Sequence, residues 1–414
     1  MSYVDTNSFA NVGNTSSSTF KKQHEISFEP EINEMINNFL QTLKTNSQPT
    51  SRSSYTVSLE TLNVLKKFIG FMKFHTTEEF MNNLKKLDLL MEGNIKPKGI
   101  IGSAVLKKEF CCGNMIRRVI FMLREEINNY NNSLKQTGDI DEDKANNKPV
   151  GSMFDLLARL PKEQPQVNSN TKSKKFEIRA TAINIIRELT DEVKNIDEQI
   201  FQIGIDLIHD NEILLIPTPD SKTILNFLIN VKKDKNWKKR NFTCIITESY
   251  PNNLQKAQKF ALKLSDLGID TIIIPDSMVF AVMNKIGKVV IGCKQIFSNG
   301  SAIVSSTGVQ TVVQCAKEFR VPIIVMAGLY KLSSISPFDI KENYLEVGGS
   351  KLTGNLLPKQ HKVTGHEGDY SRLMMVNNIN DFIAAEFIDI IITNTGAYSP
   401  SFMYRVVADN YEYS

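Results

Sequence analysis

The chain has 414 residues, of which 41% are hydrophobic and 23% charged, and its formal net charge is +4. This composition is typical of a globular protein with a sizeable core, and the length predicts two or three domains of about 150 residues each. The small net charge does not by itself indicate a nucleic-acid partner, no apolar run approaches the roughly 20 residues that span a bilayer, and the first residues lack a secretory signal pattern.

The first half of the chain has the pattern of an all-α domain, which we expect over residues 29–210. Residues 1–28 are rich in Ser, Thr and Asn and are expected to be disordered. Beyond them, apolar residues recur at helical spacing, with Ser58 as a candidate helix cap. Two polar stretches, residues 131–148 and 161–175, are predicted to be solvated loops. The predicted helices are Ile32–Leu43, Ser58–Met72, Thr76–Gly93, Gly113–Tyr130, Met153–Leu160 and Phe176–His209.

From residue 211 to residue 414 the pattern changes to that of an α/β domain. Short apolar runs rich in Ile and Val alternate with helical segments, which predicts parallel βαβ units. The predicted fold class is therefore α/β, with an N-terminal all-α domain followed by a Rossmann-like, doubly wound parallel sheet of six strands. The stretch Ser333–Asn380 has no clear period. The predicted strands are Ile213–Ile216, Phe242–Thr247, Thr271–Pro275, Lys288–Gly292, Val321–Ala327 and Ile388–Thr393, and the predicted helices are Ser221–Val231, Asn252–Leu267, Ser277–Lys285, Gly308–Phe319 and Pro400–Asp409.

The five cysteines, Cys111, Cys112, Cys244, Cys293 and Cys315, form no CxxC pair. Cys244 and Cys293 fall on predicted strands, where a reduced, buried thiol is expected. Together with the lack of a signal pattern and of a membrane-spanning run, this predicts a soluble, cytoplasmic protein of the cytosol.

Motifs for common cofactors and metals are missing. A dinucleotide-binding fold carries GxGxxG after its first strand, whereas this chain has Pro217-Thr218-Pro219-Asp220-Ser221 at that place. There is no GxxxxGK[ST] phosphate loop, and the five histidines include no HExxH pair. We therefore expect no cofactor, no metal site and no nicotinamide-dependent oxidoreductase activity.

Polar residues that follow predicted strands are the candidates for a site. Asp220, Glu248 and Asp276 each come directly after a strand, so their carboxylates could converge where ligands meet an open parallel sheet. The competing interpretation is that they cap the following helices, because Asp and Glu favour helix amino ends. Asn299-Gly300 suits either the approach of a phosphate or a plain turn, and Lys331 either holds an anion or is solvated.

Two basic features are candidates for partner binding. The run Lys232–Arg240 contains Trp237, but one aromatic residue in a basic run is more typical of a solvated loop, and no direct contact with nucleic acid is expected. Arg117 and Arg118 lie on a predicted amphipathic helix, where they either engage an acidic or phosphorylated partner or form an ordinary solvent-facing flank.

Several segments of the chain, taken together, resemble the regulatory subunits of the eukaryotic translation initiation factor 2B complex. They are NFTCIITESYP, IDTIIIPDSMVFAVMNKIGKVVIGCKQIFSNG, VPIIVMAGLYKLSSISPFD and ITNTGAYSPSFMYR. Within this family, VFAVMNKIGKVVIG followed by YKLS, the closing PSFMYR, and GNMIRRV in the helical half are most similar to the beta subunits. The resemblance covers roughly Gly113 to Tyr411.

The resemblance implies a helical domain on a Rossmann-like domain and a place in a decamer built from two copies of five subunits. That complex exchanges GDP for GTP on initiation factor 2, and its epsilon subunit carries out the exchange. Its alpha, beta and delta subunits form the core that senses phosphorylation of the factor's alpha subunit and so slows exchange in the integrated stress response. The resemblance thus implies a regulatory subunit without catalysis of its own. Its implied partners are alpha, gamma, delta and epsilon subunits, with delta the closest pairing, and initiation factor 2.

In related complexes the central interface between beta and delta subunits also binds a small-molecule activator. His209 and Asn211 match positions of that pocket, whereas Thr243 stands where a His is usual in the animal subunit. The resemblance therefore implies a subunit interface at these three residues, with an activator pocket that is altered at Thr243.

The same superfamily contains sugar-phosphate isomerases, among them the methylthioribose-1-phosphate isomerase, and a sugar-phosphate isomerase or binding protein is the alternative function. Their catalytic pair is a Cys after the first sheet strand and an Asp in a GADRIxxNG segment. This chain has Pro217 and Thr218 near the first position and Lys294 at the second. Cys293 is one residue away, which turns a strand side chain to the opposite face. We therefore predict no isomerase activity. A vestigial ligand pocket is expected at Glu248, Asp276, Asn299, Gly300 and Lys331.

Overall fold

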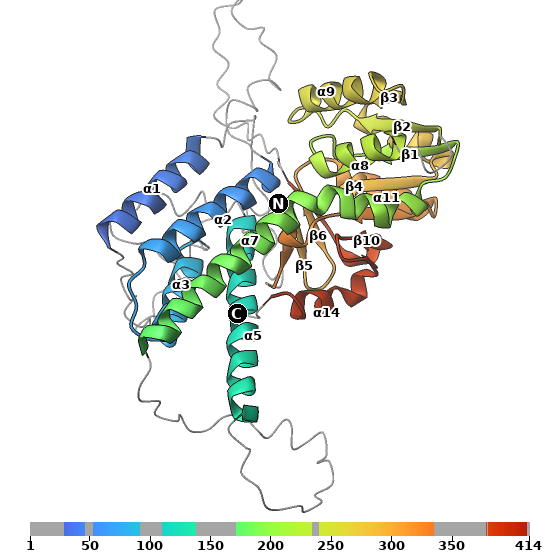
Figure 1. The fold of residues 1–414 in the computed structure, drawn as a ribbon. Helices are drawn as coiled ribbons and strands as arrows, with labels where there is room; N and C mark the ends of the chain where they lie inside the picture. Colours follow the sequence, from blue (N-terminus) through green and yellow to red (C-terminus); the bar gives the residue numbers. More distant parts are fainter. Residues whose placement is uncertain are drawn as a thin grey trace, which may run out of the picture.

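The computed structural model describes residues 29–45, 53–91, 110–137, 171–233, 240–334, 378 and 380–411. The predictions for residues 1–28, for a helix at Met153–Leu160, and for most of Lys232–Arg240 and Ser333–Asn380 lie outside the described residues. Helices come first along the chain, and a parallel sheet flanked by helices follows (Figure 1), which confirms the predicted α/β class.

The helical half consists of helices that lie beside one another (Figure 1). The helices are amphipathic, and their apolar faces are buried in a shared core. Leu62, Leu65 and Ile69, which recur at helical spacing along the second helix, are fully buried in this shared core. No helix in the described ranges is long and apolar enough to cross a bilayer. The helices are α1 (Pro30–Thr45), α2 (Ser54–Phe71), α3 (Thr77–Met91), α5 (Phe110–Thr137) and α7 (Thr171–Gly204).

The cap of α2 differs from the prediction. Ser53 is the N-cap, and its hydroxyl accepts a hydrogen bond from the Thr56 N–H at 3.4 Å. Ser58, the predicted cap, lies inside the helix and donates its hydroxyl to the Ser54 carbonyl at 2.8 Å. The chain offers several serines in succession here, and spacing alone does not tell which of them stands at the helix boundary.

Both predicted polar loops overlap helices. α5 continues to Thr137, through the first residues of the predicted loop 131–148, and α7 begins at Thr171, inside the predicted loop 161–175. Polar composition alone does not end a helix, and the overlapping residues contain neither the Gly nor the Pro that would.

The second half is built on a seven-stranded sheet with the order β11-β10-β7-β4-β1-β2-β3. Neighbouring strands are parallel, except that β11 runs antiparallel to β10. The six predicted strands are present, and the short β11 is added to them. Because β2 and β4 flank β1 on opposite sides, the chain order reverses between β1 and β4. The strands are β1 (Glu212–Ile216), β2 (Phe242–Thr247), β3 (Asp270–Ile274), β4 (Lys288–Gly292), β7 (Ile323–Met326), β10 (Ile390–Ile392) and β11 (Ala397–Tyr398).

Helices cover both faces of this sheet, as a doubly wound fold requires. Alternate residues of β1 divide between two cores: Leu214 and Ile216 join the core shared with the helical half, and Leu215 joins the other. The first face carries α8 (Lys222–Lys233) and α9 (Leu254–Ser265), and the second carries α10 (Val279–Val282), α11 (Val309–Glu318) and α14 (Met403–Ala408). Since α7 buries residues in the first core, the helical half docks on the α8–α9 face.

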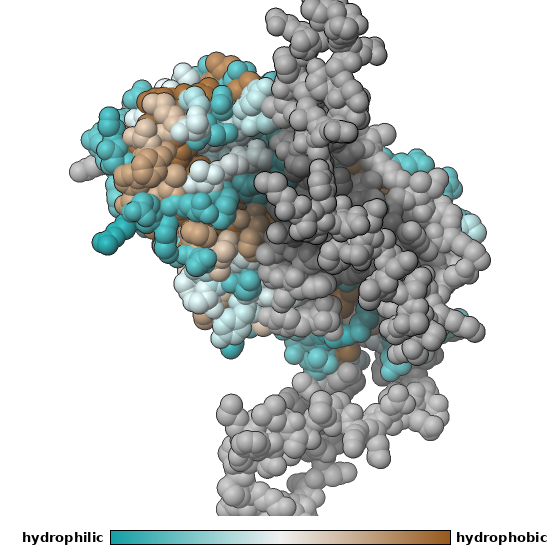
Figure 2. Space-filling model, turned by 180° about the vertical axis from the view of Figure 1, so that it is seen from behind, coloured by the Kyte–Doolittle hydropathy of each residue, from teal (hydrophilic) through white to brown (hydrophobic). Residues whose placement is uncertain are grey.

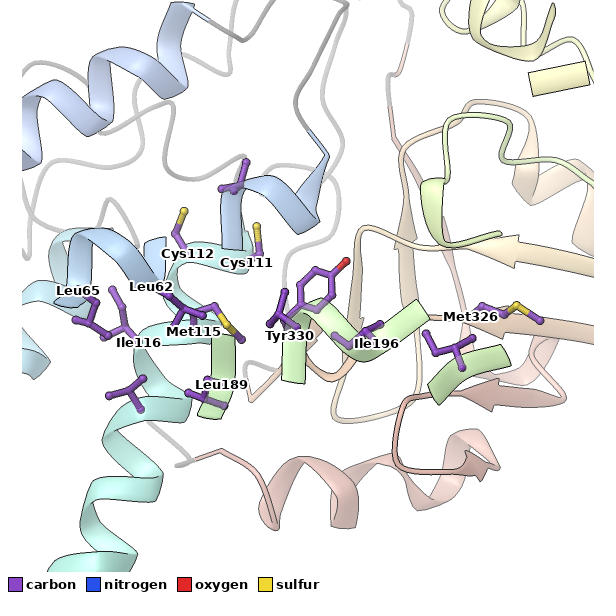
Figure 3. Close-up of a cluster of buried hydrophobic side chains, with 14 of the residues drawn as sticks. Leu62, Leu65, Cys111, Cys112, Met115, Ile116, Leu189, Ile196, Met326 and Tyr330 are labelled. Carbon is purple, nitrogen blue, oxygen red and sulfur yellow. The ribbon is translucent and has the colours of Figure 1, made fainter. Parts of the chain in front are cut away.

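Tyr330 links the two halves of the chain in this first core. In Figure 3 its ring lies between Met115 of α5 and Ile196 of α7, with Met326 of the sheet beyond. Tyr330 is only 2% exposed, and the Asn114 Nδ2 donates to its carbonyl at 3.3 Å. The turn η4 (Leu329–Lys331) that carries this tyrosine is therefore attached to helix α5.

The structure contains a second, four-stranded sheet with the order β8-β5-β6-β9, which the sequence pattern does not predict. β5 and β6 form an antiparallel hairpin, and its turn contains Gly300 with a φ of +83°. Each strand has two or three residues, too few for alternation to be recognised. The strands are β5 (Gln295–Phe297), β6 (Ala302–Val304), β8 (Leu332–Ser333) and β9 (Asp381–Ile383).

Candidate functional site

A pocket of about 610 Å³ lies at the carboxyl ends of β1 and β4. The loop after β1 contributes Asp220 and Ser221 to its lining, and the end of β4 contributes Gly292, Cys293 and Lys294. These two strands are the neighbours between which the chain order reverses, which is where open parallel sheets bind ligands. The fold therefore forms a pocket at the place where a site was expected.

Lysines dominate the charged lining of this pocket, whereas Asp197 and Asp220 are its carboxylates. Ser53, the cap of α2, also lines the pocket, so the positive end of that helix dipole borders it. An excess of cations beside a helix amino end suits an anionic ligand. The lysines are Lys222, Lys256, Lys259, Lys263, Lys294 and Lys331.

Lys331 is the buried cation of this pocket. Its Nζ donates a hydrogen bond to the Cys293 carbonyl at 2.8 Å, and the residue is 6% exposed, so it is not a solvated lysine. Burial lowers the pKa of Lys331, but Tyr330, Cys293 and Asp220 together raise it above its ordinary value. Lys331 is therefore protonated at neutral pH, and the two carboxylates of the lining, Asp220 and Asp197, both interact with its charge.

Asp220 is held in place by contacts from two other segments, the loop after β6 and helix α9. Its Oδ2 accepts a hydrogen bond from the Ser305 hydroxyl at 2.6 Å and lies 3.9 Å from the Lys256 Nζ. Ser305 follows β6 and Lys256 belongs to α9, so this carboxylate joins three segments at the rim of the pocket. Asp220 therefore has a fixed position beside the lysines.

The structure brings only one of the five predicted pocket residues, Lys331, into the described lining; Glu248, Asp276, Asn299 and Gly300 lie outside it. All four residues do follow a strand. However, β2 and β3 end away from the point where the chain order of the main sheet reverses, and β5 belongs to the second sheet. Whether the pocket binds a ligand stays a prediction.

Glu248 and Asp276 form a separate cluster at the carboxyl ends of β2 and β3. The Ser249 N–H donates to the Asp276 Oδ1 at 3.1 Å. Burial raises the pKa of Asp276, and the neighbouring Glu248 raises it further, against the lowering effect of hydrogen bonds from Ser249, Thr247 and Tyr250. Asp276 therefore does not line the pocket that contains Asp220, and its side chain does not cap the helix that follows it; it holds the loop after β2.

Asn299 and Gly300 form the turn of the β5–β6 hairpin. The Asn299 Oδ1 accepts hydrogen bonds from the Ser301 N–H at 3.0 Å and from the Ser301 hydroxyl at 2.6 Å. A Cβ at Gly300 would lie 2.5 Å from the Pro400 carbonyl oxygen, so this turn approaches another loop closely. The geometry fits the plain-turn interpretation.

The described lining has donors for an anion but lacks the pair that isomerase chemistry needs. Burial raises the pKa of the Cys293 thiol to about 11, although Lys331 lowers it, so the thiol is protonated at neutral pH. Lys294 lines the pocket where the isomerases carry an aspartate, and the Thr218 hydroxyl accepts a hydrogen bond from the Gly292 N–H at 2.8 Å. Nor do the described residues place three or more His, Cys, Asp or Glu side chains together as metal ligands.

Arg117 and Arg118, the candidates for partner binding, are buried in ion pairs and do not form a solvent-facing flank. The Arg117 Nε donates to the Asp88 Oδ2 at 3.0 Å, and Arg118 donates to both carboxylate oxygens of Glu192 at 2.9 and 2.7 Å. The two arginines are 4% and 6% exposed. Their first role is to hold helices together, and a role toward a phosphorylated partner stays a prediction.

His209, Asn211 and Thr243 come together at the amino ends of β1 and β2, the opposite edge of the sheet from the pocket. His209 and Asn211 are exposed and precede β1, and Thr243 pairs with Ile213 across the two strands. The Asn211 N–H donates to the Asn241 carbonyl at 2.6 Å. The structure thus gathers these residues on one open surface, and their contact with another subunit stays a prediction.

The sequence reasoning missed the lysines that α8 and α9 bring to the pocket. Lys256, Lys259 and Lys263 are spaced three and four residues apart, so they share one face of α9. This spacing is visible in the sequence. Their role in the pocket was not visible, because only the tertiary arrangement brings that face of α9 and the end of β4 to the same pocket.

Comparison with known proteins assigns the chain to a family. The model of the initiation factor 2 subunit family matches residues 108–400. The translation initiation factor eIF2B subunit beta of Schizosaccharomyces pombe is 30% identical over 392 residues, which cover 87% of this chain and 92% of that protein. The similarity therefore includes both the helical half and the sheet.

More distant relatives match mainly over part of the chain. The eIF2B subunit delta of Dictyostelium discoideum is 28% identical over 231 residues, 53% of this chain and 34% of that protein. The ribose 1,5-bisphosphate isomerase of Archaeoglobus fulgidus is 27% identical over 238 residues, 58% of this chain and 70% of that enzyme.

Solved structures share the fold at low sequence identity. The crystal structure of eIF2B beta from Chaetomium thermophilum superposes with a TM-score of 0.64 at 21% identity, covering 92% of this chain and 93% of that one. A chain of the tetrameric eIF2B-beta2-delta2 complex from the same organism gives a TM-score of 0.62 at 19% identity, covering 92% and 95%.

Proposed function

The chain belongs to the initiation factor 2 subunit family, and on that premise we propose that it is a non-catalytic regulatory subunit of an eIF2B-type complex. The observation that carries the proposal is the similarity to an eIF2B beta subunit along nearly the whole length of both proteins. The delta and isomerase relatives match a smaller share of this chain. A delta-type subunit is the first partner in this proposal, because a chain of the same fold occurs in a beta2-delta2 tetramer.

The finer part of the proposal concerns nucleotide exchange on initiation factor 2. In it, the chain combines with alpha, gamma, delta and epsilon subunits in the cytosol, and the epsilon subunit carries out the exchange of GDP for GTP. This chain helps to form the core that binds the factor's alpha subunit and slows exchange when that subunit is phosphorylated. The protonated thiol of Cys293 and the lysine at position 294 support a role without catalysis.

Native mass spectrometry of the tagged chain, purified gently from its source cells, tests the assembly. The expected result is a stoichiometric complex with four other subunit types. Recovery of the chain as a lone homodimer would contradict the proposal.

Release of labelled GDP from initiation factor 2 tests the regulatory role. A complex that contains the chain should release GDP more slowly when the factor's alpha subunit is phosphorylated. The matched preparation without this chain should lose that difference. Equal inhibition in both preparations would exclude a sensing role.

A sugar-phosphate isomerase is the second candidate, and two observations favour it: the lysine-lined pocket and the archaeal isomerase relative. Incubation of the purified chain with ribose 1,5-bisphosphate, followed by NMR, distinguishes the two functions. We expect the substrate to persist unchanged, because neither a reactive thiolate nor an aspartate stands at the two catalytic positions. Turnover that depends on Cys293 would establish the enzyme instead.

A further inference from the structure

Helix α2 begins at the wall of the lysine-lined pocket. Its cap, Ser53, and the residues Ser54 and Thr56 of its first turn line the cavity, and all three are half-buried. The first N–H groups of a helix lack acceptors within the helix and carry partial positive charge, so this wall attracts negative charge. The chain therefore presents its own hydroxyl groups to a cavity that favours an anion.

Ser54 has the hydroxyl that is open to chemistry. The Ser53 hydroxyl accepts a hydrogen bond from the Thr56 N–H at 3.4 Å and lies 3.1 Å from the Thr56 hydroxyl, so these two hydroxyls are paired with each other. Tyr55 packs against the core of the helical half. The Ser54 hydroxyl, by contrast, has no hydrogen-bond partner among the described residues. It is the hydroxyl of this turn that a reaction would disturb least.

Three lysines of the pocket have no counter-ion. Lys222 of α8 and Lys259 and Lys263 of α9 are exposed, and none of them forms an ion pair with another described residue. Hydrophilic residues are spread over the sheet half (Figure 2, teal), so exposed lysines alone would indicate no site. These three differ because they line one cavity together with the buried Lys331, whose ammonium group has a single hydrogen-bond acceptor within the described part of the chain.

The carboxylates of the described lining are already engaged. Asp220 accepts from the Ser305 hydroxyl and lies beside Lys256. The Asp197 Oδ2 accepts a hydrogen bond from the Asn226 Nδ2 at 2.7 Å. A doubly charged anion that entered the cavity would therefore find cations that these carboxylates do not neutralise.

We propose that Ser54 is a phosphorylation site whose phosphate group occupies the lysine-lined pocket. A protein kinase carries out the reaction with ATP. The Ser54 oxygen bonds to the γ-phosphorus, the bond from that phosphorus to the bridging oxygen breaks, ADP leaves with the electron pair, and the hydroxyl proton passes to a base of the kinase. The product carries nearly two negative charges and three strong acceptor oxygens. The pocket of about 610 Å³ has room for it, since about 15 Å³ is enough to hold a water molecule.

The modification joins the two halves of the chain. Ser54 belongs to the helical half, whereas Lys222 and Lys259 lie on helices that cover the sheet. A phosphate between them forms charge-assisted hydrogen bonds across the junction and fills the place that a free anion would take. This inference goes beyond the proposed function and does not depend on it, because it concerns this chain in whatever complex contains it.

Phosphopeptide mapping of the full chain, purified from its source cells with phosphatase inhibitors, tests whether the modification occurs. The expected result is a phosphate group on Ser54 in part of the molecules. A phosphate found only on Ser53 or Thr56 would overturn the choice of residue. A first turn of α2 without phosphate, in growing and in starved cells alike, would overturn the modification itself.

Phosphorus NMR tests where the phosphate lies, on the full chain with phosphoserine incorporated at position 54. The matched control carries phosphoserine at position 76, since Thr76 also stands at a helix amino end, where its hydroxyl accepts from the Glu79 N–H at 3.2 Å, and lies outside the described lining. A pH titration gives the pKa of each phosphate. We expect the value at position 54 to be about one pH unit lower than at position 76, because nearby cations favour the doubly charged form.

The double variant Lys259→Met, Lys263→Met separates the lysines from other influences on the phosphate, such as the acidic Glu78 and Glu79 in the first turn of the control helix. Both lysines are exposed, so the variant should fold normally. It should raise the pKa of the phosphate at position 54 and leave that at position 76 unchanged. An unchanged pKa at position 54 would overturn the placement of the phosphate in the pocket.

Discussion

Lys331 combines two features that seldom occur together, a charge and deep burial. Its ammonium group donates to the Cys293 carbonyl and lies over the Tyr330 ring, 5.7 Å from the ring centroid. The backbone carbonyl, the aromatic face and the nearby Asp220 replace the favourable interactions with water that this cation loses on burial. These contacts stabilise the charged form of Lys331, and an anion in the pocket would add a further favourable interaction with its ammonium group.

Gly292 is required by the close approach of β4 to the loop after β1. A Cβ at this position would lie 2.0 Å from the Ser221 hydroxyl oxygen and 2.4 Å from the Ser221 Cβ. We expect Gly292→Ala to lower the free energy of unfolding by about 1–3 kcal/mol, as overpacking does. Urea denaturation followed by circular dichroism measures the change. The double variant with Ser221→Gly should recover most of the loss, and equal destabilisation in single and double variants would refute the steric explanation.

The raised pKa of Asp276 predicts that the stability of the protein depends on pH. Because burial raises the pKa of this carboxyl above its ordinary value, folding favours the protonated form, and this stabilisation is lost as the pH rises through the folded-state pKa. Asp276→Asn keeps an acceptor for the Ser249 N–H without the charge. We therefore expect the variant to equal or exceed the original protein in stability at pH 7, with the advantage shrinking as the pH falls toward 4.

Thermal unfolding between pH 4 and pH 7 measures this difference. Asp266→Asn, at an exposed aspartate at the end of α9, is the matched control and should leave the shape of the pH profile unchanged. An Asp276→Asn variant that is less stable at pH 7 than at pH 4, relative to the original protein, would show that the charge itself holds the loop.

At the scale of elements, one network joins the helical half to the sheet. Glu192 of α7 receives both hydrogen bonds from Arg118 of α5, and its Oε1 also accepts from the Asn394 Nδ2 at 2.9 Å. The Asn394 Oδ1 accepts from the Leu329 N–H at 2.9 Å, and the Tyr411 hydroxyl donates to the Leu329 carbonyl. Helices α5 and α7 are therefore linked to η4, the turn that carries Lys331.

Removing the charge of Glu192 should loosen this connection. We expect Glu192→Gln to lower the free energy of unfolding by about 3 kcal/mol, because it leaves the buried Arg118 guanidinium without its counter-ion. Glu188→Gln, at an exposed glutamate one turn earlier on α7, is the matched control. Denaturant unfolding of the two variants compares them, and equal stabilities would mean that the network contributes little.

At the scale of the whole molecule, the sheet separates two surfaces with different chemistry. The lysine-lined pocket lies at the carboxyl ends of the strands, and the exposed His209 and Asn211 lie with the half-buried Thr243 at their amino ends. A ligand in the pocket and a subunit at the other edge therefore do not compete for space.

The charge of the pocket predicts binding of a simple anion. We expect inorganic phosphate to raise the midpoint of thermal unfolding, since a ligand that binds the folded state stabilises it. Lys331→Met, or Lys256→Met at the rim, should weaken phosphate binding about tenfold. Lys285→Met, at an exposed lysine outside the described lining, should not. Equal responses to phosphate in all four proteins would show a general salt effect instead of a site.

The sequence by itself determined the class of the fold and the path of its main elements. Period-2 and period-3.6 patterns are local, and long β-branched runs such as Phe242–Thr247 are strands in nearly any buried setting. The family was also readable from the sequence, because its motifs are contiguous segments. Parallel topology also points to the carboxyl ends of the strands, where the structure has a pocket, although Lys331 is the one of the five predicted residues in its described lining.

Only the tertiary structure decided which residues share the pocket and which face the solvent. Asp220 and Asp276 both follow strands, yet strand order puts the first beside Lys331 and the second near the outer edge. Arg117 and Arg118 have the sequence pattern of an exposed flank, and α3 and α7 supply the carboxylates that bury them. These outcomes depend on contacts between residues far apart in the chain, for which a single sequence holds no local signal.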